Sequence, residues 1–293
     1  MKGKRTIFLA GDSTVQSYSA SKYPQAGWGQ EFWKFFEGAG ECHESVRPDA
    51  PGSHCVCYEL PKLNIENHAF AARSSRSFIE QGRLSEIMKV AEPGDYLFVQ
   101  FAHNDAYKAR EERYVAPEDF HIWLQKYKDA CDERGMTCVY VTPVTMRVFD
   151  KEGNCQIAFR EYADEMVKFA SSVKAPLVDL SALSTALMTE VGPKAARDYY
   201  LWIAPGEYPD TDLKDGANDN AHFQENGAVR IAKLVAEGLK ELSGFDSLGF
   251  LQELLRSDYK IPEFARHLPK DFAGWGEEED MLLDAGKEII KRE

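Results

Sequence analysis

The sequence has no hydrophobic run long enough to cross a membrane. None of its apolar stretches approaches the roughly 18 residues that a transmembrane helix needs. The basic start, MKGKR, precedes an apolar run at 6–10 that is too short for the core of a signal peptide and has no small-residue cleavage site after it. We therefore expect no membrane partner and a cytoplasmic location, unless an export signal has been removed.

The sequence also has too little positive charge for a nucleic-acid-binding protein. It carries 35 Lys and Arg residues against 48 Asp and Glu residues, which gives a formal net charge of −13. Phosphate backbones are repelled by such a balance, and so is an anionic membrane surface. A neutral or weakly charged substrate fits better, and we expect no nucleic-acid partner.

Cysteine is sparse, and a chain of this length needs no disulfide to hold its core. The six cysteines are scattered through 293 residues. One segment nevertheless groups several metal-ligating types, namely Cys42, His43, His54, Cys55 and Cys57. They could form a structural zinc site, although the Cys-x-Cys spacing is not the usual one. Buried or incidental thiols and surface histidines explain the group better, so we predict no metal here.

Apolar, β-branched runs alternate with helix-like stretches along the chain. The strand candidates are 6–10, 63–67, 96–101, 137–142 and 177–180. The helix candidates are 29–36, 77–90, 117–134, 160–173 and 225–242, and the last carries an apolar stripe at helical spacing. Alternating strands and helices predict a parallel sheet with helices on both faces. Such sheets bind their ligands beyond the carboxyl ends of the strands.

Two segments depart from this alternation. Residues 38–61 are rich in Gly, Pro, Cys and His, and we interpret them as an inserted loop within a main domain at 1–242. Residues 243–293 form a C-terminal extension with predicted helical pieces at 248–255 and 277–291. An apolar stripe in this extension must be covered, either by its own domain or by a second copy in a homodimer. The stripe consists of Leu248, Leu251, Leu254 and Leu255.

Three groups of polar residues follow predicted strands or precede a predicted helix. Ser13 ends the run FLAGDS, Asn104 follows the strand YLFVQF, and Asp219 and His222 lie within one turn before the last helix of the domain. A strand-end serine alone is usually a turn residue, and a lone histidine before a helix is usually a cap. Their joint placement instead predicts acyl transfer, which needs a nucleophile, a base, a group that orients the base and oxyanion donors.

Four sequence blocks, in this order, resemble the SGNH/GDSL hydrolase superfamily. They are GDSTVQSY at 11–18, NHAFAARSSRSFIEQGR at 67–83, VQFAHND at 99–105 and DNAHFQENGA at 219–228. Within the superfamily, the chain is most similar to rhamnogalacturonan acetylesterase-like carbohydrate esterases, over about residues 5–242. The resemblance implies a three-layer α/β/α flavodoxin-like fold with a central parallel sheet. It also implies that 1–242 is the catalytic domain and that serine hydrolysis proceeds without a metal or cofactor.

The resemblance assigns roles to individual residues. It implies that Ser13 is the nucleophile, His222 the base and Asp219 its partner. The N–H groups of Ser13 and Ala72 and the side-chain amide of Asn104 would form the oxyanion hole. Ala72, and also Ala102, stand where the family usually has glycine, and an alanine costs on the order of 1 kcal/mol if its φ must be positive.

The same resemblance implies an acetylated plant-wall oligosaccharide of the pectin or rhamnogalacturonan type as substrate. We expect Arg73, Trp28 and Tyr208 to contact it, although Arg73 and Arg76 would serve equally well in structural ion pairs. A short-chain esterase or lipase of other specificity is an alternative. Another is a catalytically weakened sugar-binding relative that stacks sugars on aromatic rings. Its candidate rings are Trp28, Tyr107, Tyr199, Tyr200, Trp202 and Tyr208.

A metal-dependent phosphoesterase is a further alternative. Its candidate ligands are Asp12, His103, Asp105, Asp219 and His222. A two-metal site needs several carboxylates and imidazoles that converge on ions about 4 Å apart. The first strand ends in Asp-Ser-Thr and has no Asp-x-His pair, so the ligand count falls short and this alternative is disfavoured.

Overall fold

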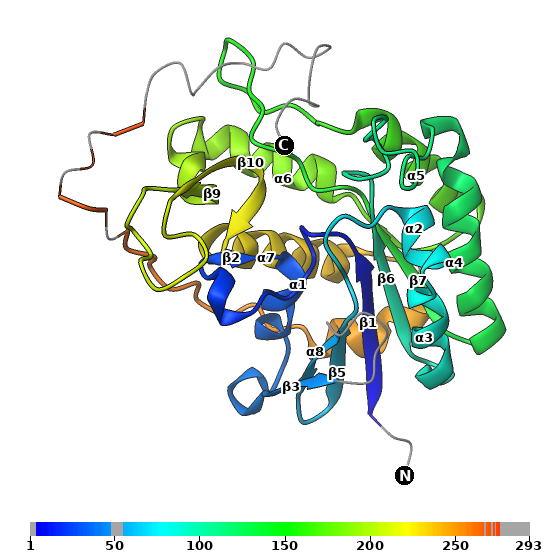
Figure 1. Cartoon of the computed structure of the whole chain (residues 1–293). Helices are drawn as coiled ribbons and strands as arrows, with labels where there is room; N and C mark the ends of the chain where they lie inside the picture. Colours follow the sequence, from blue (N-terminus) through cyan, green and yellow to red (C-terminus); the bar gives the residue numbers. More distant parts are fainter. Residues whose placement is uncertain (1–3, 48–54, 267, 271, 273, 276–293) are drawn as a thin grey trace.

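A seven-stranded sheet with helices on both faces forms the centre of the molecule (Figure 1). The structure is a computed structural model, and it describes residues 4–47, 55–266, 268–270, 272 and 274–275. The strand order is β3-β4-β5-β1-β6-β7-β8. Helices cover both faces of the sheet, so the expected three-layer α/β/α architecture is confirmed.

Five neighbouring strands of this sheet are parallel. They are β5 (Leu63–Asn67), β1 (Arg5–Gly11), β6 (Tyr96–Gln100), β7 (Thr137–Val141) and β8 (Leu177–Val178). β1 lies at the centre, with Ile7 in register with Ile65 on one side and Tyr96 on the other. Counted along the chain, the parallel strands take the flavodoxin-like order 2-1-3-4-5, which reverses direction between β1 and β6. All five predicted strands are confirmed.

The segment predicted to be an inserted loop, 38–61, contains two strands instead. β3 (His43–Arg47) and β4 (Cys55–Glu59) pair antiparallel with each other, and β4 pairs antiparallel with β5. They extend the sheet by two strands at one edge, so the loop prediction is wrong for these residues. The strand sequences HESVR and CVCYE mix polar and apolar residues, so they lack the continuous apolar run that marked the strands of the parallel core.

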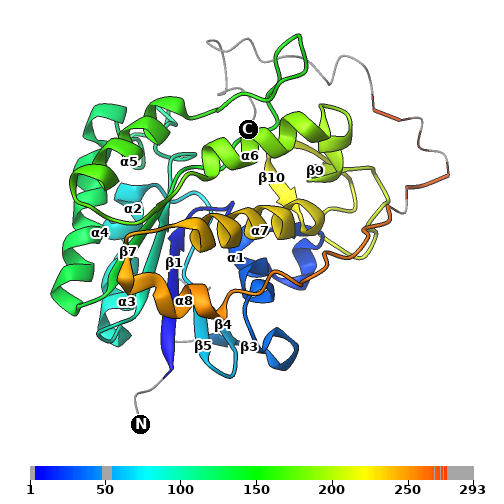
Figure 2. The same ribbon diagram turned by 180° about the vertical axis from the view of Figure 1, so that it is seen from behind.

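The sheet separates two buried apolar clusters, and helices cover the cluster on each face. One face is covered by α2 (Ser75–Glu80), α3 (Arg83–Val90), α4 (Phe120–Arg134) and α5 (Arg160–Ser172). The other carries α1 (Trp28–Glu31), α6 (Leu180–Val191), α7 (Glu225–Glu241) and α8 (Gly249–Leu254), and Figure 2 shows this side. The predicted helix at 77–90 is divided into α2 and α3 at Gly82, whose φ is 78°. The sequence analysis missed α6.

A second, three-stranded sheet lies beside α7. It contains β2 (Gln25–Ala26), β10 (Ala217–Gln224) and β9 (Tyr200–Ile203), and both pairings are antiparallel. The ladder between β10 and β9 is irregular between Asn218 and Phe223. The predicted turn before α7 is therefore a strand with an irregular stretch in its middle. This stretch carries Asp219 and His222.

The C-terminal extension packs on its own chain. Leu248 and Leu251 are fully buried, and Leu254 and Leu255 are nearly so. These four residues belong to the same apolar cluster as α7, so the stripe that suggested a homodimer is already covered. The predicted helix at 277–291 lies outside the described residues. No helix in the described part of the chain is long and apolar enough to span a membrane.

Candidate active site

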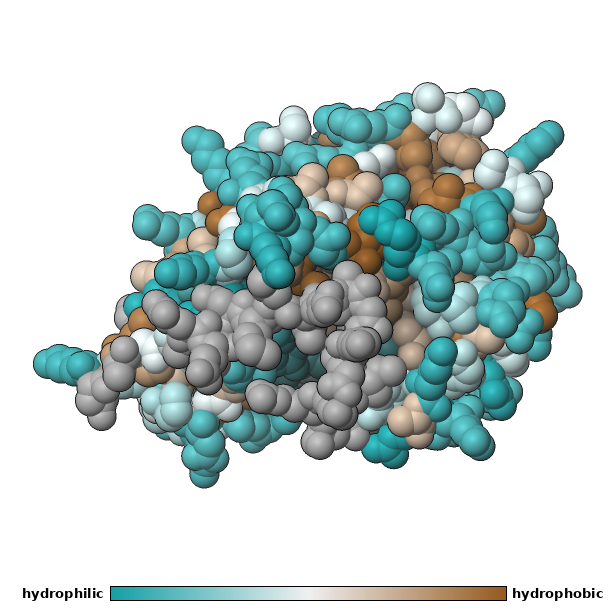
Figure 3. Space-filling view, turned by 90° about the horizontal axis from the view of Figure 1, so that it is seen from above, coloured by the Kyte–Doolittle hydropathy of each residue, from teal (hydrophilic) through white to brown (hydrophobic). Residues whose placement is uncertain are grey.

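The predicted site residues lie beyond the carboxyl ends of neighbouring parallel strands. Ser13 follows β1, Ala72 follows β5, and Asn104 follows β6. The strand order reverses between β1 and β6, which is where sheets of this kind bind ligands. His222 reaches the same place from β10 in the second sheet. Seen from this side, the surface is largely hydrophilic, with hydrophobic residues showing in its middle (Figure 3).

The turn that carries Ser13 is fixed by hydrogen bonds on both sides. Asp12 Oδ1 accepts from the N–H of Thr14 at 2.9 Å and from its hydroxyl at 2.8 Å. The Tyr18 hydroxyl donates to the Ser13 carbonyl oxygen at 2.9 Å. Gly11 is required before this turn because a Cβ there would lie 2.5 Å from the side chain of Val15. Ser13 is thereby held with its hydroxyl toward His222.

Ser13, His222 and Asp219 form a continuous hydrogen-bonded chain. His222 Nε2 lies 2.8 Å from Ser13 Oγ, and His222 Nδ1 lies 2.7 Å from Asp219 Oδ2. The other carboxylate oxygen of Asp219 accepts from the N–H groups of Ala221 at 2.6 Å and His222 at 2.9 Å. The backbone in the irregular stretch of β10 therefore orients the Asp219 carboxylate, and this carboxylate orients the His222 imidazole. This is the geometry of a nucleophile, a base and an orienting acid.

Asp219 and His222 shift each other's pKa values. Burial alone would raise the pKa of Asp219, but the hydrogen bond and charge of His222, with two backbone N–H groups, lower the pKa to about 2. Burial alone would lower the pKa of His222, but the hydrogen bond and charge of Asp219 outweigh it, and the charge of Asp12 adds to the rise. Asp219 is thus ionised at neutral pH and stabilises a protonated His222.

Two backbone N–H groups are available for an oxyanion. Within the described part of the chain, the N–H groups of Ser13 and Ala72 donate to no protein acceptor. Ala72 has a φ of 62°, in the left-handed region that favours glycine. Ala102 is also unusual, with a φ of 149°. Both alanines at the family's glycine positions therefore have positive φ, so the expected backbone strain is present.

Asn104 is held by two arginine residues. Its Nδ2 donates to the Arg73 carbonyl oxygen at 3.1 Å, and its Oδ1 accepts from Arg113 Nη1 at 3.1 Å. Arg113 fixes which end of the amide is the donor, and one N–H of Nδ2 remains for a ligand. The sequence analysis missed Arg113, because it lies in the charged stretch KAREER, which carries no motif.

A second acid–imidazole pair lies directly beside the nucleophile. His103 Nδ1 is 3.5 Å from Asp12 Oδ2, Asp12 is fully buried, and the His103 ring packs 4.5 Å from the ring of Phe159. The candidate phosphoesterase ligands do not converge. Asp105 is fully buried and accepts from the N–H and hydroxyl of Ser75, and no three of the five have ligand atoms within 4.8 Å of one another.

The aromatic residues predicted to contact a sugar lie in the core or away from Ser13 and His222. Trp28 is 1% exposed and donates through Nε1 to Gln100 Oε1 at 2.9 Å, so its prediction as a substrate contact is wrong. The tryptophan is core because α1 turns it onto the sheet. Tyr208 lines a pocket with Tyr23 and Arg266 whose lining includes neither Ser13 nor His222. Tyr200 and Trp202 are fully buried as well, so two further candidate rings for sugar stacking are core residues.

Arg73 is held within the loop after β5. Its guanidinium lies 4.3 Å from the ring of Phe70, Nη1 donates to the Ala71 carbonyl oxygen, and Nε donates to Gln81 Oε1, both at 2.8 Å. Burial and the nearby Arg113 charge lower its pKa. Arg73 therefore helps to shape the loop that carries Ala72. Arg76 pairs with Glu80 on α2, as the structural alternative required.

The family of the chain follows from comparison with known proteins. The model of the GDSL-like lipase/acylhydrolase family matches residues 7–235. The chain belongs to this family. It is a carboxylic ester hydrolase. The matched range includes every candidate catalytic residue.

Two relatives from Bacillus subtilis (strain 168) align with most of this hydrolase. The rhamnogalacturonan acetylesterase RhgT is 36% identical over 242 residues, which cover 83% of this chain and 92% of that protein. The probable rhamnogalacturonan acetylesterase YesY is 37% identical over 238 residues, which cover 80% and 93%. The predicted resemblance to rhamnogalacturonan acetylesterases is thus confirmed.

Solved structures confirm the fold. The protein YxiM from Bacillus subtilis superposes with a TM-score of 0.64 at 25% identity, over 83% of this chain and 58% of that chain. The acetylxylan esterase Axe2 from Geobacillus stearothermophilus, solved as a catalytic mutant, superposes with a TM-score of 0.54 at 12% identity, over 84% and 98%. The second likeness shows the fold alone.

Proposed function

We propose that this esterase removes O-acetyl groups from rhamnogalacturonan-type oligosaccharides through an acyl-enzyme on Ser13. The observation that carries the proposal is the hydrogen-bonded chain from Ser13 Oγ through His222 to Asp219, with links of 2.8 and 2.7 Å. The substrate class rests on the two relatives named for rhamnogalacturonan acetylesterase activity.

In the first half of the reaction, His222 Nε2 takes the proton of Ser13 as Oγ attacks the acetyl carbonyl carbon. Negative charge develops on the carbonyl oxygen, where the N–H groups of Ser13 and Ala72 and the Asn104 amide donate to it. Asp219 stabilises the imidazolium and does not take its proton. As the C–O bond to the sugar breaks, His222 returns the proton to the departing sugar oxygen, which leaves as a hydroxyl group.

In the second half, water replaces the sugar. His222 removes a proton from the water, whose oxygen attacks the acyl carbon of the serine ester. The same donors stabilise the second oxyanion, and His222 then protonates Ser13 Oγ as acetate leaves. Each half uses the same groups in reverse roles, so no cofactor takes part in either step of the proposal.

The charge near the oxyanion site favours an acidic sugar chain. The Arg113 guanidinium donates to Asn104 and its charge lies near that of Arg73, although the whole chain carries a formal net charge of −13. Guanidinium groups bind carboxylates well, and rhamnogalacturonan-type chains contain uronic acids. A cytoplasmic location is part of the proposal, and the six cysteines, all within the described residues, form no disulfide, which is typical of a reducing compartment. The substrates there would be short imported fragments.

Acetate release from matched oligosaccharides tests the substrate class. We expect acetylated rhamnogalacturonan fragments to be hydrolysed faster than acetylated xylan fragments, and p-nitrophenyl acetate faster than the butyrate. Replacing Arg113 by Gln should weaken the preference for the uronic-acid substrate more than the activity on p-nitrophenyl acetate. Equal rates on both polysaccharide fragments, or a preference for butyrate, would contradict the proposal and favour a short-chain esterase of other specificity.

A further inference from the structure

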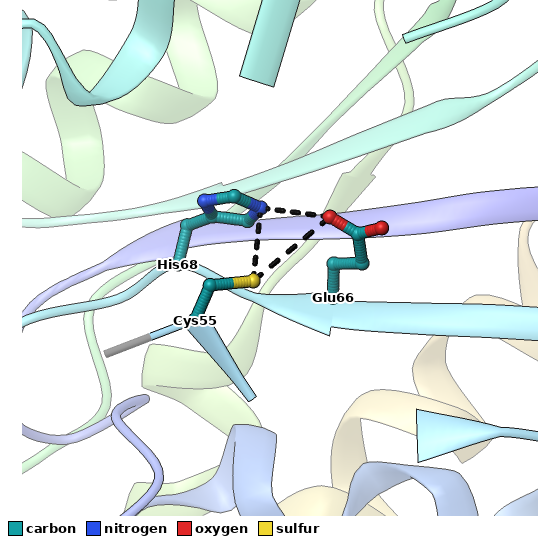
Figure 4. A group of neighbouring side chains, drawn as sticks. All are labelled: Cys55, Glu66 and His68. Carbon is teal, nitrogen blue, oxygen red and sulfur yellow. Dashed lines mark hydrogen bonds and ion pairs between the residues drawn. The ribbon is translucent and has the colours of Figure 1, made fainter. Parts of the chain in front are cut away.

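A group of metal-ligating side chains lies outside the catalytic site, at the edge of the central sheet. Cys55 Sγ, Glu66 Oε2 and His68 Nε2 come within 4.8 Å of one another, and they form the only such group of three or more in the described part of the chain (Figure 4). Cys55 and His68 are buried, and Glu66 is half-buried. None of these residues takes part in the proposed acyl transfer.

The strand register places a fourth possible metal ligand, Cys57, on the same face as the other three. β4 and β5 are antiparallel, and Cys57 stands opposite Glu66. Alternate residues of a strand face the same side, so Cys55 and Cys57 share a face with Glu66 and His68. Cys57 Sγ lies 3.9 Å from Cys55 Sγ. Two short motifs, Cys-x-Cys and Glu-x-His, thereby form a square of ligands on neighbouring strands.

The distances match those of a tetrahedral zinc site. With ordinary zinc–ligand bonds, tetrahedral geometry separates sulfur from nitrogen by about 3.5 Å, nitrogen from oxygen by about 3.3 Å and sulfur from oxygen by about 3.5 Å. The corresponding separations here are 3.3 Å for Cys55 and His68, 3.1 Å for His68 and Glu66, and 3.9 Å for Cys55 and Glu66. Each agrees to within about 0.4 Å.

The arrangement does not suit a second catalytic thiol. In a Cys–His–acid relay, the thiol and the carboxylate face opposite nitrogens of the imidazole. Here Cys55 Sγ and Glu66 Oε2 both face Nε2 of His68. Three donor atoms that converge on one point are instead arranged to share one ion. The surroundings are also rigid, since the N–H of His68 donates to the Leu9 carbonyl oxygen at 3.0 Å.

We propose that Cys55, Glu66 and His68 bind one structural zinc ion, with Cys57 as the fourth ligand after rotation of its side chain. Two thiolates and a carboxylate around Zn²⁺ leave one net negative charge, and the Arg83 guanidinium lies nearby, with Nη1 3.4 Å from the His68 carbonyl oxygen. The ion would tie β4 to β5 where the chain enters the loop that carries Ala72. The site differs from the zinc set considered from sequence: His43 pairs with Glu59, at the far end of the hairpin from Cys55, and His54 lies outside the described residues.

Cobalt titration of the untagged full-length chain tests the proposal. Co²⁺ bound by thiolates in a tetrahedral site absorbs by sulfur-to-metal charge transfer, and zinc should displace it at one ion per chain. Cys55→Ser should weaken zinc binding by at least about 100-fold and reduce the absorption of each bound Co²⁺, because only the Cys57 thiolate remains. Cys42→Ser, which changes a cysteine outside the group, should leave both unchanged.

Other outcomes separate the alternatives. If Cys55→Ser does not fold, Glu66→Gln tests the site at a half-buried side chain of nearly equal shape: it should weaken zinc binding, while any Co²⁺ still bound keeps its sulfur band. Absence of the charge-transfer band in a protein whose thiols are reduced would overturn the proposal. So would equal loss in Cys42→Ser, or zinc retained at full affinity in Cys55→Ser and Glu66→Gln. Metal content is measured without substrate, so these results are independent of the esterase proposal.

Discussion

Because Ala72 has a positive φ, we predict that replacing it by glycine stabilises the protein. Ala72 is exposed and has a φ of 62°. A left-handed alanine costs about 1–2 kcal/mol, and glycine adds about 0.4–1 kcal/mol of unfolded-state entropy. We therefore expect Ala72→Gly to raise the free energy of unfolding by about 0.5–1 kcal/mol. Since glycine keeps the N–H group, esterase activity should be retained.

Two neighbouring alanines provide controls for this prediction. Ala71 is outside the set of residues with positive φ, so Ala71→Gly should only increase unfolded-state entropy and destabilise by about 0.4–1 kcal/mol. Ala102 has a φ of 149° but is fully buried. Relief of about 1–3 kcal/mol of strain there is offset by the entropy of glycine and by about 0.8 kcal/mol for the lost buried methyl group, so Ala102→Gly should be nearly neutral.

Urea unfolding of the three variants measures these differences directly. The predicted order of stability is Ala72→Gly above wild type, Ala102→Gly near wild type and Ala71→Gly below it. If Ala72→Gly destabilises the protein as much as Ala71→Gly does, the backbone at Ala72 is not strained. The reasoning about the oxyanion loop would then be refuted.

Three further predictions concern Asp219, His222 and Asp105. Asp219→Asn should lower kcat/KM by about 10⁴-fold, because the imidazole loses the acceptor that fixes its tautomer. In the wild type, the acidic limb of kcat/KM should lie above pH 6.5, since the pKa of His222 is raised and only the neutral form accepts a proton; an acidic limb below pH 6.5 would contradict this. Burial raises the pKa of Asp105 to about 7. The folded state therefore binds more protons than the unfolded state between about pH 4 and 7, and stability should fall by up to about 4 kcal/mol as the pH rises through this window. Asp105→Asn should flatten this pH dependence in urea unfolding, and an unchanged slope would count against it.

The parallel core of the fold could be predicted because its strands are buried on both faces. Runs such as YLFVQF are apolar except for Gln100, and the helices between them carry apolar stripes. The three-stranded sheet could not be predicted in the same way. The sequence of β10, ANDNAHFQ, is mostly polar and carries Asp219 and His222 in its middle, so it lacks the apolar pattern that would reveal a strand.

The residues of the candidate site also divide into those that the sequence could predict and those that it could not. Ser13, Asp219 and His222 could be proposed from the sequence because they lie in blocks with an ordered, chemically meaningful spacing, and the structure joins them by hydrogen bonds. Trp28 was misplaced because an aromatic residue near a motif looks the same whether it faces a sugar or the core. Arg113 was missed because only the folded loop brings it to Asn104.

The zinc-ligand group shows why tertiary contacts are needed. Glu66 and His68 lie about ten residues from Cys55, in a strand that reads as ordinary sheet sequence. Only the antiparallel pairing of β4 with β5 brings these side chains to one face. Cys42 and His43 were grouped with Cys55 because they are near in sequence, although strand geometry puts His43 four residue pairs away from the pair that contains Cys55.

Ser13→Ala tests the central claim most directly. Hydrolysis of p-nitrophenyl acetate by the wild type and the variant should be compared, with circular dichroism to show that both are folded. The account predicts a loss of at least about 10⁴-fold in kcat, because no other hydroxyl is hydrogen-bonded to His222 in the described part of the chain. A folded Ser13→Ala variant that keeps most of its activity would contradict the serine mechanism.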